Sequence, residues 1–422
     1  MYDAIIVGAR CAGASTAMLL ARKGHRVLLV DRARFPSDIP QGHFIHQQGP
    51  LRLQRWGLLD RIKASGCPAV ESAVLDLGDF GLRGERLSID DVAIAYGPRR
   101  LVLDKILLEA AIAAGAEMRE CCPVEGFLTD GDRIVGIRGR DRNGNVFTEH
   151  ASVVVGADGR NSRLAHAVKA PVYEEMPTLT CFLFSYWSGV PERGLRMHVG
   201  KDRAVFGFPT HDNLFAVFAA MPINEAKRVM ADSEGSFMAT AAIAPELADM
   251  LRNGHREERF YGAADLPNFF RKPFGPGWAL VGDAGHHKDP YMALGVNDAL
   301  RDADFLSDAL DETLSGRADF DTALAAYERR RNETALPLYR ENLNSAQFVP
   351  LPQEAYQLRA AMRGNPDVTR EFFLARFGRT PRESFFNPEN LQRVMQGYDG
   401  APSGPVWRSN PDGERIPTSS AK

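Results

Sequence analysis

The stretch Ala4-Ile5-Ile6-Val7-Gly8-Ala9-Arg10-Cys11-Ala12-Gly13 decides the fold of this chain. Its first four residues form an apolar run that predicts a buried strand. Small and apolar residues at helical spacing over 14–23 predict a helix that is closed by Gly24. Residues 27–30, Val-Leu-Leu-Val, predict a second buried strand. A strand, a tight turn, a helix and a strand within about 30 residues are typical of a βαβ unit in a parallel sheet.

The turn after the first predicted strand carries a dinucleotide-binding pattern. It matches G-x-G-x-x-G at Gly8 and Gly13, with Arg10 in place of the second glycine. In this setting the free N–H groups and the dipole of the helix can hold a pyrophosphate. Asp31 ends the second strand, where a carboxylate accepts hydrogen bonds from a ribose 2′-hydroxyl and repels a 2′-phosphate. The pattern predicts the adenosine of FAD or NAD, with Arg10 as an additional cation near the phosphates.

Two further glycine-containing turns follow predicted buried strands. Ala157-Asp158-Gly159 comes after the strand 153–155, although an Asp-Gly pair by itself is most often an ordinary turn. Gly282-Asp283 comes after the strand 278–281, where the carboxylate can hold a ribose or ribitol hydroxyl. A helix predicted from about 296 to 310 begins close behind, and its dipole can stabilise negative charge on a reduced flavin.

The rest of the chain shows two contrasting patterns. Between residues 117 and 155, apolar segments are separated by two hairpin turns at 130–132 and 142–145, which predict a small antiparallel meander. Over 178–222, aromatic residues alternate with others and predict a separate antiparallel sheet. Helices are predicted over 51–64, over 101–114 and from 296 to about 395, and the Gly-, Pro- and Ser-rich tail 398–422 is expected to be poorly ordered.

The composition narrows the classes of partner. The chain has 422 residues, 44% apolar and 25% charged, which is average for a globular protein and long enough for two or three packed units. With 51 Lys and Arg against 54 Asp and Glu the net charge is −3, so no basic excess attracts nucleic acid or an anionic membrane. Charges interrupt the N-terminal apolar run, so neither a signal peptide nor a membrane span is predicted. Five cysteines, none in a C-x-x-C pair, indicate a reduced, cytoplasmic compartment and no metal.

Together, the motifs resemble the FAD-dependent monooxygenases of the para-hydroxybenzoate hydroxylase superfamily, which are related to geranylgeranyl reductase-like flavoproteins. The resemblance covers about residues 1–310 and rests on motifs that stand in the correct order. These are Gly8 to Gly13 with Asp31, Arg100-Leu-Val-Leu-Asp104, Gly156-Ala-Asp158-Gly159 with Ser162, and Gly282-Asp283 with Pro290 and Gly295.

The resemblance implies an α/β fold. Its parts are a doubly wound, Rossmann-like FAD-binding domain, an inserted antiparallel β-sheet domain for the substrate, and a helical C-terminal region. The expected ranges are 1–72, 98–168 and 270–315 for the FAD-binding domain, 73–97 and 169–269 for the substrate domain, 316–397 for the helical region and 398–422 for a flexible tail.

FAD is the cofactor that the resemblance implies. In the family, the residue matching Asp158 contacts both FAD and the approaching nicotinamide, the residue matching Asp283 binds the ribitol, and an arginine matching Arg100 lies by the flavin phosphates. Asp283 follows a buried strand, so we expect its carboxylate to be buried and bonded to ribitol hydroxyls or nearby N–H groups. The predicted FAD-binding residues are Gly8, Arg10, Ala12, Gly13, Asp31, Arg32, Arg100, Asp158, Gly159, Gly282, Asp283, Pro290, Gly295, Val296 and Asn297.

The motifs constrain the catalytic and substrate-binding residues less tightly. His43 and His46 follow the second strand and can transfer protons at neutral pH, although ordinary loop histidines are the alternative and a third metal ligand is lacking. Pro290, in the third motif, is a further catalytic candidate. An aromatic group either packs one face of the sheet or lines the substrate cavity: Phe184, Tyr186, Phe206, Phe208 and Tyr291.

The predicted reaction is that of a monooxygenase. NADH, NADPH or a partner flavin reductase supplies electrons, O2 forms a flavin hydroperoxide, and an electron-rich aromatic or polyketide-like substrate is hydroxylated or epoxidised. A carbon–carbon double-bond reductase of the geranylgeranyl reductase type is the main alternative, and it needs no oxygen. A halogenase is less favoured because Phe184 to Pro191 does not match the W-x-W-x-I-P segment of those enzymes. A Rossmann-like binding module without activity, and a homodimer, also stay open.

Overall fold

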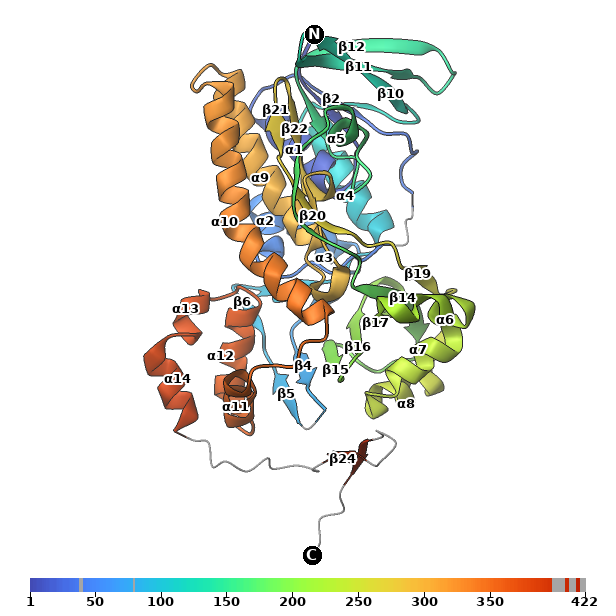
Figure 1. The fold of residues 1–422 in the computed structure, drawn as a ribbon, viewed down its shortest axis with the longest axis vertical. Coiled ribbons are helices and arrows are strands. Elements are labelled where there is room, and N and C mark those ends of the chain that lie inside the picture. The colour runs from blue at the N-terminus through green and yellow to red at the C-terminus, as the bar shows by residue number, and fades with distance from the viewer. Residues whose placement is uncertain (38–40, 79, 397–406, 410–414, 418–422) are drawn as a thin grey trace, which may run out of the picture.

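A parallel sheet forms the centre of the part of the molecule that holds the N-terminus (Figure 1). The structure is a computed structural model, and it describes residues 1–37, 41–78, 80–396, 407–409 and 415–417. The predicted βαβ unit lies at the middle of this sheet. In order across the sheet, the parallel strands are β9 (Glu117–Arg119), β2 (Val27–Val30), β1 (Tyr2–Val7), β12 (Val146–Gly156) and β22 (Trp278–Leu280).

The two faces of the parallel sheet are covered differently. Its strands are buried on both faces, so that Ile6 and Val155 face one side and Ile5 and Val154 the other. A doubly wound sheet carries helices on both faces, but here strands cover most of the second face, because β12 continues into an antiparallel meander. The first face carries α1 (Cys11–Arg22), α4 (Arg100–Ala113) and α9 (Gly295–Leu314), and the second carries β10 (Val124–Asp130), β11 (Arg133–Arg140) and α5 (Arg163–Ala167).

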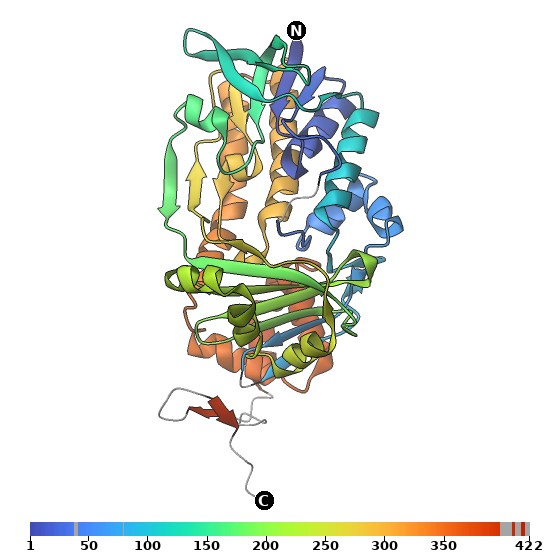
Figure 2. The same ribbon diagram turned by 90° about the vertical axis from the view of Figure 1, so that its right-hand side faces the viewer.

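A second sheet crosses the molecule beyond the ends of α9 and its neighbours (Figure 2). Alternation along its longest strand separates two faces, since Phe182 and Phe184 pack on one side and Leu183 and Trp187 on the other. One pair, β15 with β4, is parallel in a sheet that the sequence predicted to be antiparallel throughout. The strand order is β18 (His255–Arg256), β14 (Thr180–Ser188), β17 (Phe215–Pro222), β16 (Ala204–Pro209), β15 (Leu195–Val199), β4 (Ala73–Asp76) and β5 (Gly81–Gly84), with β19 (Tyr261–Ala263) also on β14.

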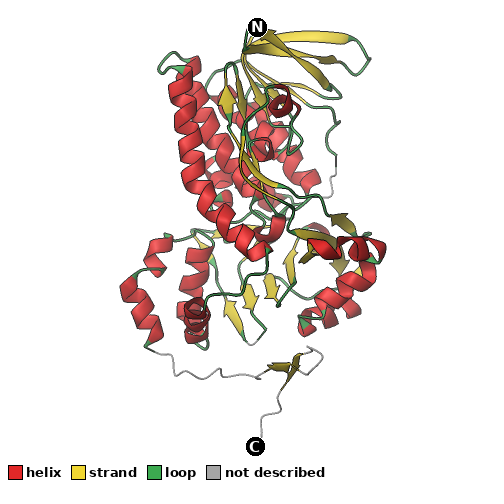
Figure 3. Ribbon diagram, in the orientation of Figure 1, coloured by secondary structure: helices red, strands yellow, loops and turns green. Residues whose placement is uncertain are grey.

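Helices occupy the outer side of the second sheet and the C-terminal region (Figure 3). The face with Leu183 and Trp187 packs against a group of short helices, and β5 packs against the C-terminal helices through Leu82 and Phe373. The short helices are α6 (Ala226–Ala231), α7 (Ser233–Ala241) and α8 (Pro245–Asn253). The C-terminal helices are α11 (Gln353–Met362), α12 (Pro366–Arg376), α13 (Arg382–Phe385) and α14 (Pro388–Met395).

The long helix α10 (Phe320–Ala346) connects the two halves of the molecule. It runs beside α9, and its last residue Ala346 packs with Phe182 of the second sheet (Figure 1). A three-stranded sheet makes a second connection beside it. Its strands are β13 (Val172–Met176), β20 (Asn268–Arg271) and β23 (His286–His287).

One predicted helix is divided in the structure, and most of the predicted tail lies outside the described residues. The helix expected over 51–64 is divided at Gly57, whose φ of 74° interrupts it, into α2 (Gly49–Arg55) and α3 (Leu59–Ala64). Most of the tail 398–422 lies outside the described residues.

Among the described residues, none of the helices combines the length and the apolar character that crossing a membrane requires. The remaining strands are short: β3 (Ala69–Val70), β6 (Ser88–Ile89), β7 (Val92–Ala93), β8 (Ala95–Tyr96), β21 (Phe274–Gly275), β24 (Trp407–Ser409) and β25 (Arg415–Pro417).

Candidate functional site

The three glycine-containing turns meet at the carboxyl ends of β1, β12 and β22. Gly8 has a φ of 104°, and a Cβ there would lie 2.4 Å from the carbonyl oxygen of Ala157 in the second motif. Gly282 has a φ of 62°, and its Cβ would lie 2.8 Å from the Cβ of Ala12 in α1. Both positions require glycine because backbone and neighbour leave no room for a side chain. The spacing of the motifs thus reflects one packed junction.

A cavity of about 2300 Å³ opens on this junction and extends to the second sheet. Ligand pockets usually measure about 300–1,000 Å³, so this one has room for a dinucleotide and a second ligand. Three of the predicted site residues do not line the cavity: Gly13, Gly282 and Tyr186. The other predicted cofactor, catalytic and substrate residues line the cavity: Gly8, Arg10, Ala12, Asp31, Arg32, Arg100, Asp158, Gly159, Asp283, Pro290, Gly295, Val296, Asn297, His43, His46, Phe184, Phe206, Phe208 and Tyr291.

Two helices begin at this cavity without a side chain that caps them. The buried first turn of α1, from Cys11 to Gly13, has no capping side chain and no acidic residue. The helix α9, which begins at Gly295, also lacks a side-chain cap, whereas Asp319 caps α10 and Asn365 caps α12. A helix N-terminus without a cap presents free N–H groups and the positive end of the dipole. The start of α1 is therefore suited to negative charge inside the cavity. The start of α9 is suited as well, because Lys288 and Arg301 neutralise the carboxylate of Asp298 in its first turn.

The predicted ribose-binding carboxylate, Asp31, and the predicted ribitol-binding carboxylate, Asp283, differ in their hydrogen bonds within the protein. Asp31 accepts hydrogen bonds from the backbone N–H groups of Ala9, at 2.8 Å, and Ala33, at 2.7 Å. Asp283 is exposed, lines the cavity and accepts no hydrogen bond from the described residues. The expectation that Asp283 is buried was wrong, because the cavity itself opens beside the turn that carries it. Its oxygens are free for the hydroxyls of a ligand.

Only one of the two carboxylate oxygens of Asp158, in the second motif, has a hydrogen-bond partner in the described residues. Its Oδ2 accepts a hydrogen bond of 2.7 Å from the backbone N–H of Arg163. Its Oδ1 is buried and has no hydrogen-bond partner in the described part of the chain. Burial raises the pKa of this carboxyl group. An unsatisfied buried oxygen at the wall of a cavity marks a position for a donor on a ligand.

Arg10 and Arg100 share one carboxylate beside the first turn. Asp104 is buried; its Oδ2 accepts a hydrogen bond of 2.7 Å from Arg10 and one of 3.1 Å from Arg100, whose guanidinium also reaches Oδ1. Arg10 further donates to the hydroxyl of Ser37, at 2.9 Å. Arg10, predicted as an additional cation near the phosphates, is thus held in place by Asp104 and Ser37. Two guanidinium groups on one carboxylate still leave an excess of positive charge next to the turn.

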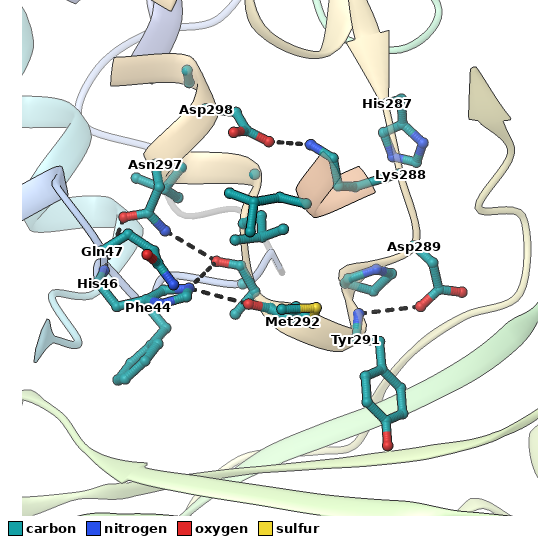
Figure 4. Close-up of a pocket in the computed structure, with 18 of the residues that line it drawn as sticks. Phe44, His46, Gln47, His287, Lys288, Asp289, Tyr291, Met292, Asn297 and Asp298 are labelled. Carbon is teal, nitrogen blue, oxygen red and sulfur yellow. Dashed lines mark hydrogen bonds and ion pairs between the residues drawn. The ribbon is translucent and has the colours of Figure 1, made fainter. Parts of the chain in front are cut away.

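The loop from Asp289 to Ala293 lines the cavity and lies beside the strands of the second sheet (Figure 4). The buried Asp289 accepts hydrogen bonds from the hydroxyl of Thr180, at 2.6 Å, and from the backbone N–H of Tyr291, at 3.1 Å. Pro290 begins a short 3-10 turn that Asp289 caps, and the ring of Tyr291 points away from the loop toward the second sheet. Asp289 therefore fixes the loop to β14, on which Thr180 lies.

His46 and Asn297 fix the other end of this loop (Figure 4). The Nε2 of His46 lies 3.1 Å from the carbonyl oxygens of both Met292 and Ala293, so it carries the proton. The side chain of Asn297 accepts from the backbone N–H of His46 at 2.9 Å and donates to Ala293 at 3.2 Å. Burial lowers the pKa of His46 to about 4, so the ring is neutral at pH 7. Its buried Nδ1 has no partner in the described part of the protein and is available as an acceptor.

Burial keeps His43 neutral, and two hydrogen bonds fix its tautomer. Its Nδ1 lies 3.1 Å from the carbonyl oxygen of Gly97, which only accepts, so Nδ1 donates and Nε2 accepts from the hydroxyl of Tyr186 at 3.0 Å. Burial lowers the pKa of His43 to about 3. Both ring nitrogens are occupied, an arrangement that favours an ordinary structural histidine over proton transfer near neutral pH. Tyr186 supports His43 rather than lining the cavity.

Aromatic rings form the wall opposite the loop. Phe206 lies edge-on to Tyr291, with ring centroids 5.2 Å apart, and Phe208 stacks on Phe218 at 5.5 Å. Phe184 stacks on the other side of this group, 4.8 Å from Phe218. The group gives the cavity an apolar, water-poor side.

Sequence reasoning missed three partners in the site. Asp104 stood in a quoted motif but only its four-residue spacing from Arg100 hinted at an ion pair. Thr180, the partner of Asp289, gave no sign in the sequence. Lys288 is buried and pairs with Asp298 in the first turn of α9 (Figure 4). In the described residues, no group of three or more His, Cys, Asp or Glu side chains could hold a metal, and all five cysteines are free thiols.

The observed groups fit FAD. The uncapped start of α1 and the arginine pair suit a pyrophosphate, and the free carboxylate of Asp283 suits a polyol chain. The uncapped start of α9 at Gly295 suits the anionic edge of a reduced flavin. These features line one cavity.

Comparisons with known proteins agree with this assignment. The FAD binding domain family matches residues 1–256 and 271–341. Kynurenine 3-monooxygenase of Salinispora arenicola is 27% identical over 393 residues, covering 84% of this chain and 81% of that protein. Digeranylgeranylglycerophospholipid reductase of Methanocella arvoryzae is 26% identical over 312 residues, covering 71% and 74%.

Halogenases are also similar. Tryptophan 2-halogenase of Chondromyces crocatus is 25% identical over 340 residues; the match covers 77% of this chain and 64% of that protein, less than two thirds of its length. The solved structure of a myxobacterial chondrochloren halogenase has a TM-score of 0.75 at 21% identity, covering 98% of each chain, which shows a shared fold. Because the family match spans most of the chain, this protein belongs to the FAD binding domain family of the FAD-dependent hydroxylase superfamily, and it is an enzyme with FAD as its cofactor.

Proposed function

We propose that the protein is a monooxygenase that transfers one oxygen atom from O2 to an electron-rich organic substrate, aromatic or polyketide-like. Its electrons come from NADH, NADPH or a partner flavin reductase. The observation that carries this proposal is the continuity of one cavity from the dinucleotide turn, past the loop 289–293, to the aromatic face of the second sheet. A flavin held at that loop faces a chamber with apolar walls, as oxygen transfer requires.

We assign FAD binding to the part built on the parallel sheet and substrate binding to the part built on the second sheet. We assign residues 1–72, 98–168 and 270–315 to FAD binding and residues 73–97 and 169–269 to the substrate. The C-terminal helices, within 316–397, close the cavity on a third side.

The chain's own residues bind and orient rather than react. The start of α1 with Arg10 and Arg100 holds the pyrophosphate, Asp31 the ribose and Asp283 the ribitol. When bound, FAD supplies the capacity to take up two electrons and to pass them to oxygen. The start of α9 at Gly295 stabilises the negative charge of the reduced form.

Other residues keep the site in place. Asp289 and His46 hold the two ends of the flavin-facing loop through hydrogen bonds to Thr180 and to the carbonyl of Met292. Phe184, Phe206 and Phe208 exclude water from the reacting centre. We assign no proton transfer to His43, since both of its nitrogens are engaged.

A double-bond reductase is the second candidate, and the similarity to digeranylgeranylglycerophospholipid reductases favours it. That reaction passes a hydride to the substrate and needs an apolar chamber but no O2. The halogenase alternative has its support in the tryptophan 2-halogenase similarity, while the segment Phe184 to Pro191 lacks W-x-W-x-I-P.

Oxygen uptake separates these candidates. The holoenzyme is supplied with NADH, NADPH or a flavin reductase and tested against a panel of phenols, anilines and aromatic acids. We expect that a substrate stimulates O2 consumption and electron-donor oxidation in equal amounts. Donor oxidation that a substrate accelerates under anaerobic conditions would contradict the proposal and favour the reductase, and uptake that depends on chloride or bromide would favour the halogenase.

A further inference from the structure

The C-terminal wall of the cavity carries more positive than negative charge. It is formed by the end of α10, by α11 and by the segment that joins α12 to α13. In this wall, arginines outnumber carboxylates by four to two: Arg340, Arg359, Arg376 and Arg382 against Glu341 and Glu383.

The outer charges of this wall are neutralised. Arg340 pairs with Glu174 at 2.6 Å, and its side chain is 62% exposed. Arg382 pairs with Glu341 at 3.3 Å and is 59% exposed. Solvent screens such pairs, so they add little to the charge inside the cavity.

The inner two arginines are poorly compensated. Arg376 has Glu341 as its nearest carboxylate in the described residues, at 3.9 Å, and shares it with Arg382. Arg359 donates from Nη1 to the carbonyl of Ala355 in its own helix at 2.8 Å, while its Nε is buried without a partner in the described part of the chain. Burial, followed by the charge of Arg376, lowers the pKa of Arg359 to about 10. Burial likewise lowers the pKa of Arg376.

This basic wall adjoins the flavin-facing loop and the aromatic chamber. The backbone carbonyl of Arg376 accepts a hydrogen bond of 3.0 Å from the side chain of Gln47, the neighbour of His46, which places the end of α12 beside His46 in the cavity wall. Tyr291 lies edge-on to Phe348 at the end of α10, with centroids 5.7 Å apart, and Phe377, the neighbour of Arg376, lies edge-on to His46 at 5.9 Å. A ligand in the aromatic chamber can therefore extend to the two arginines.

The geometry points to an anion-binding subsite formed by Arg359 and Arg376, which takes the carboxylate of a substrate whose aromatic body lies against Phe184, Phe206 and Phe208. This inference rests on the proposed function and narrows it to aromatic acids. The Nε–H of Arg359 is buried and unused, and the side chain of Arg376 is 28% exposed and has no carboxylate of its own in the described residues. Withdrawing such donors from water is costly unless an anion satisfies them. A carboxylate matches the planar fork of a guanidinium, and the apolar walls strengthen the pairing.

The test compares an acid with its neutral analogue. The probes are 2-naphthoate and 2-naphthamide, which share the ring system and differ in charge. Their binding to the FAD-loaded enzyme is followed by the change in flavin absorbance, which needs no turnover. We expect naphthoate to bind about tenfold tighter than naphthamide or better, as a charged hydrogen bond provides. Equal affinities for the two probes would overturn the inference without any variant.

Variants locate the preference. Arg359→Met and Arg376→Met should each reduce the preference for naphthoate to about threefold or less, while Arg359→Lys and Arg376→Lys should keep part of it. Arg393→Met, at a half-exposed arginine of α14 that pairs with Glu371, is the matched control and should leave it unchanged. A preference that survives in both Met variants with normal flavin content would place the anion elsewhere and overturn the inference.

The same variants separate the substrate from a nucleotide. NADH and NADPH also carry anionic groups, so the rate of flavin reduction is measured over a range of each nucleotide. Unchanged naphthoate binding with a raised nucleotide requirement in the Met variants would assign the arginines to phosphates and overturn the carboxylate subsite. A double-bond reductase or a halogenase would still show the naphthoate preference, so failure of the proposed reaction is distinguishable from failure of this site.

Discussion

The buried carboxylate of Asp289 accepts a hydrogen bond of 2.6 Å from the hydroxyl of Thr180 and a second one, of 3.2 Å, from the backbone N–H of the same residue. Asp289 begins the loop 289–293 that lines the cavity, and Thr180 begins the longest strand of the second sheet. One side chain thus joins the cavity loop that follows the parallel sheet to the second sheet. Burial raises the pKa of Asp289 to about 6 in spite of these bonds.

The raised pKa predicts a pH-dependent contribution to stability. An unfolded aspartate titrates near pKa ~3.9, so between about pH 4 and 6 the folded state binds the proton more tightly, and stability is lost as the pH rises through this window. The loss amounts to at most about 3 kcal/mol, which corresponds to about two pKa units. In Asp289→Asn this component is absent, and urea unfolding of both proteins from pH 4 to 7 measures it as a difference.

The decisive feature is the direction in which this stability difference changes with pH. The free energy of unfolding of wild type, minus that of Asp289→Asn, should fall between pH 4 and 6 and be level above about pH 7. A difference that rises over the same interval would mean that the carboxylate has a lowered pKa and is stabilised as an anion. Absolute stability of the variant is not at issue, since the amide also changes the hydrogen bonds to Thr180.

Asp283→Ala should weaken FAD binding. The exposed carboxylate has no partner in the described part of the chain, so its substitution removes ligand contacts and leaves the protein core untouched. The expected loss is roughly 1 to 3 kcal/mol, or about one to two decades in Kd, as for other charged hydrogen bonds. Flavin fluorescence during FAD titration of the apoprotein measures it. Asp249→Ala, 65% exposed on α8, is the control, and equal affinity in both variants would refute the role of Asp283.

Asp104→Asn should destabilise the protein itself. It leaves Arg10 and Arg100 with no carboxylate between them in a buried position, which typically costs about 3 to 5 kcal/mol. Glu109→Gln, an exposed change on the same helix that affects pairs with Arg61 and Lys105, should cost less than about 1 kcal/mol. Chemical denaturation of the apoproteins gives both values, and similar costs for the two would contradict the shared-carboxylate arrangement.

His43→Gln should leave the pH profile of turnover unchanged in shape. The pKa of about 3 keeps the imidazole neutral over the working range, and its hydrogen bonds to Gly97 and Tyr186 are structural. The rate of substrate-stimulated oxygen uptake is measured from pH 5.5 to 9 in both proteins. The disappearance of an ionisation near neutral pH in the variant would show that His43 does transfer protons.

The sequence predicted the junction of the three glycine-containing turns far better than the contacts within the aromatic wall, for a physical reason. Gly8 and Gly282 are required by local backbone conformation and close packing, and such requirements leave fixed patterns along the chain. The aromatic alternation of β14 likewise predicted the correct face for Phe184. Alternation cannot reveal that Tyr186, two residues on, is engaged by His43 from a loop more than 140 residues earlier.

The arginines of the C-terminal wall show the same limit. Arg359 and Arg376 lie in unremarkable helical stretches, and only the packing of α11 and α12 against the second sheet brings them to the cavity. The break at Gly57 was missed because the amphipathic pattern continues through it from α2 to α3. Long-range contacts of this kind leave no local pattern in a single sequence.

The proposed reaction is tested most directly by the origin of the oxygen atom in the product. The FAD-loaded enzyme is given an electron donor, a stimulating substrate from the panel and O2 labelled with oxygen-18, and the product is analysed by mass spectrometry. The account predicts a product that carries one labelled oxygen atom, with the second atom released as water. A product that gains two hydrogens and no label, or that carries a halogen in place of hydrogen, would contradict it.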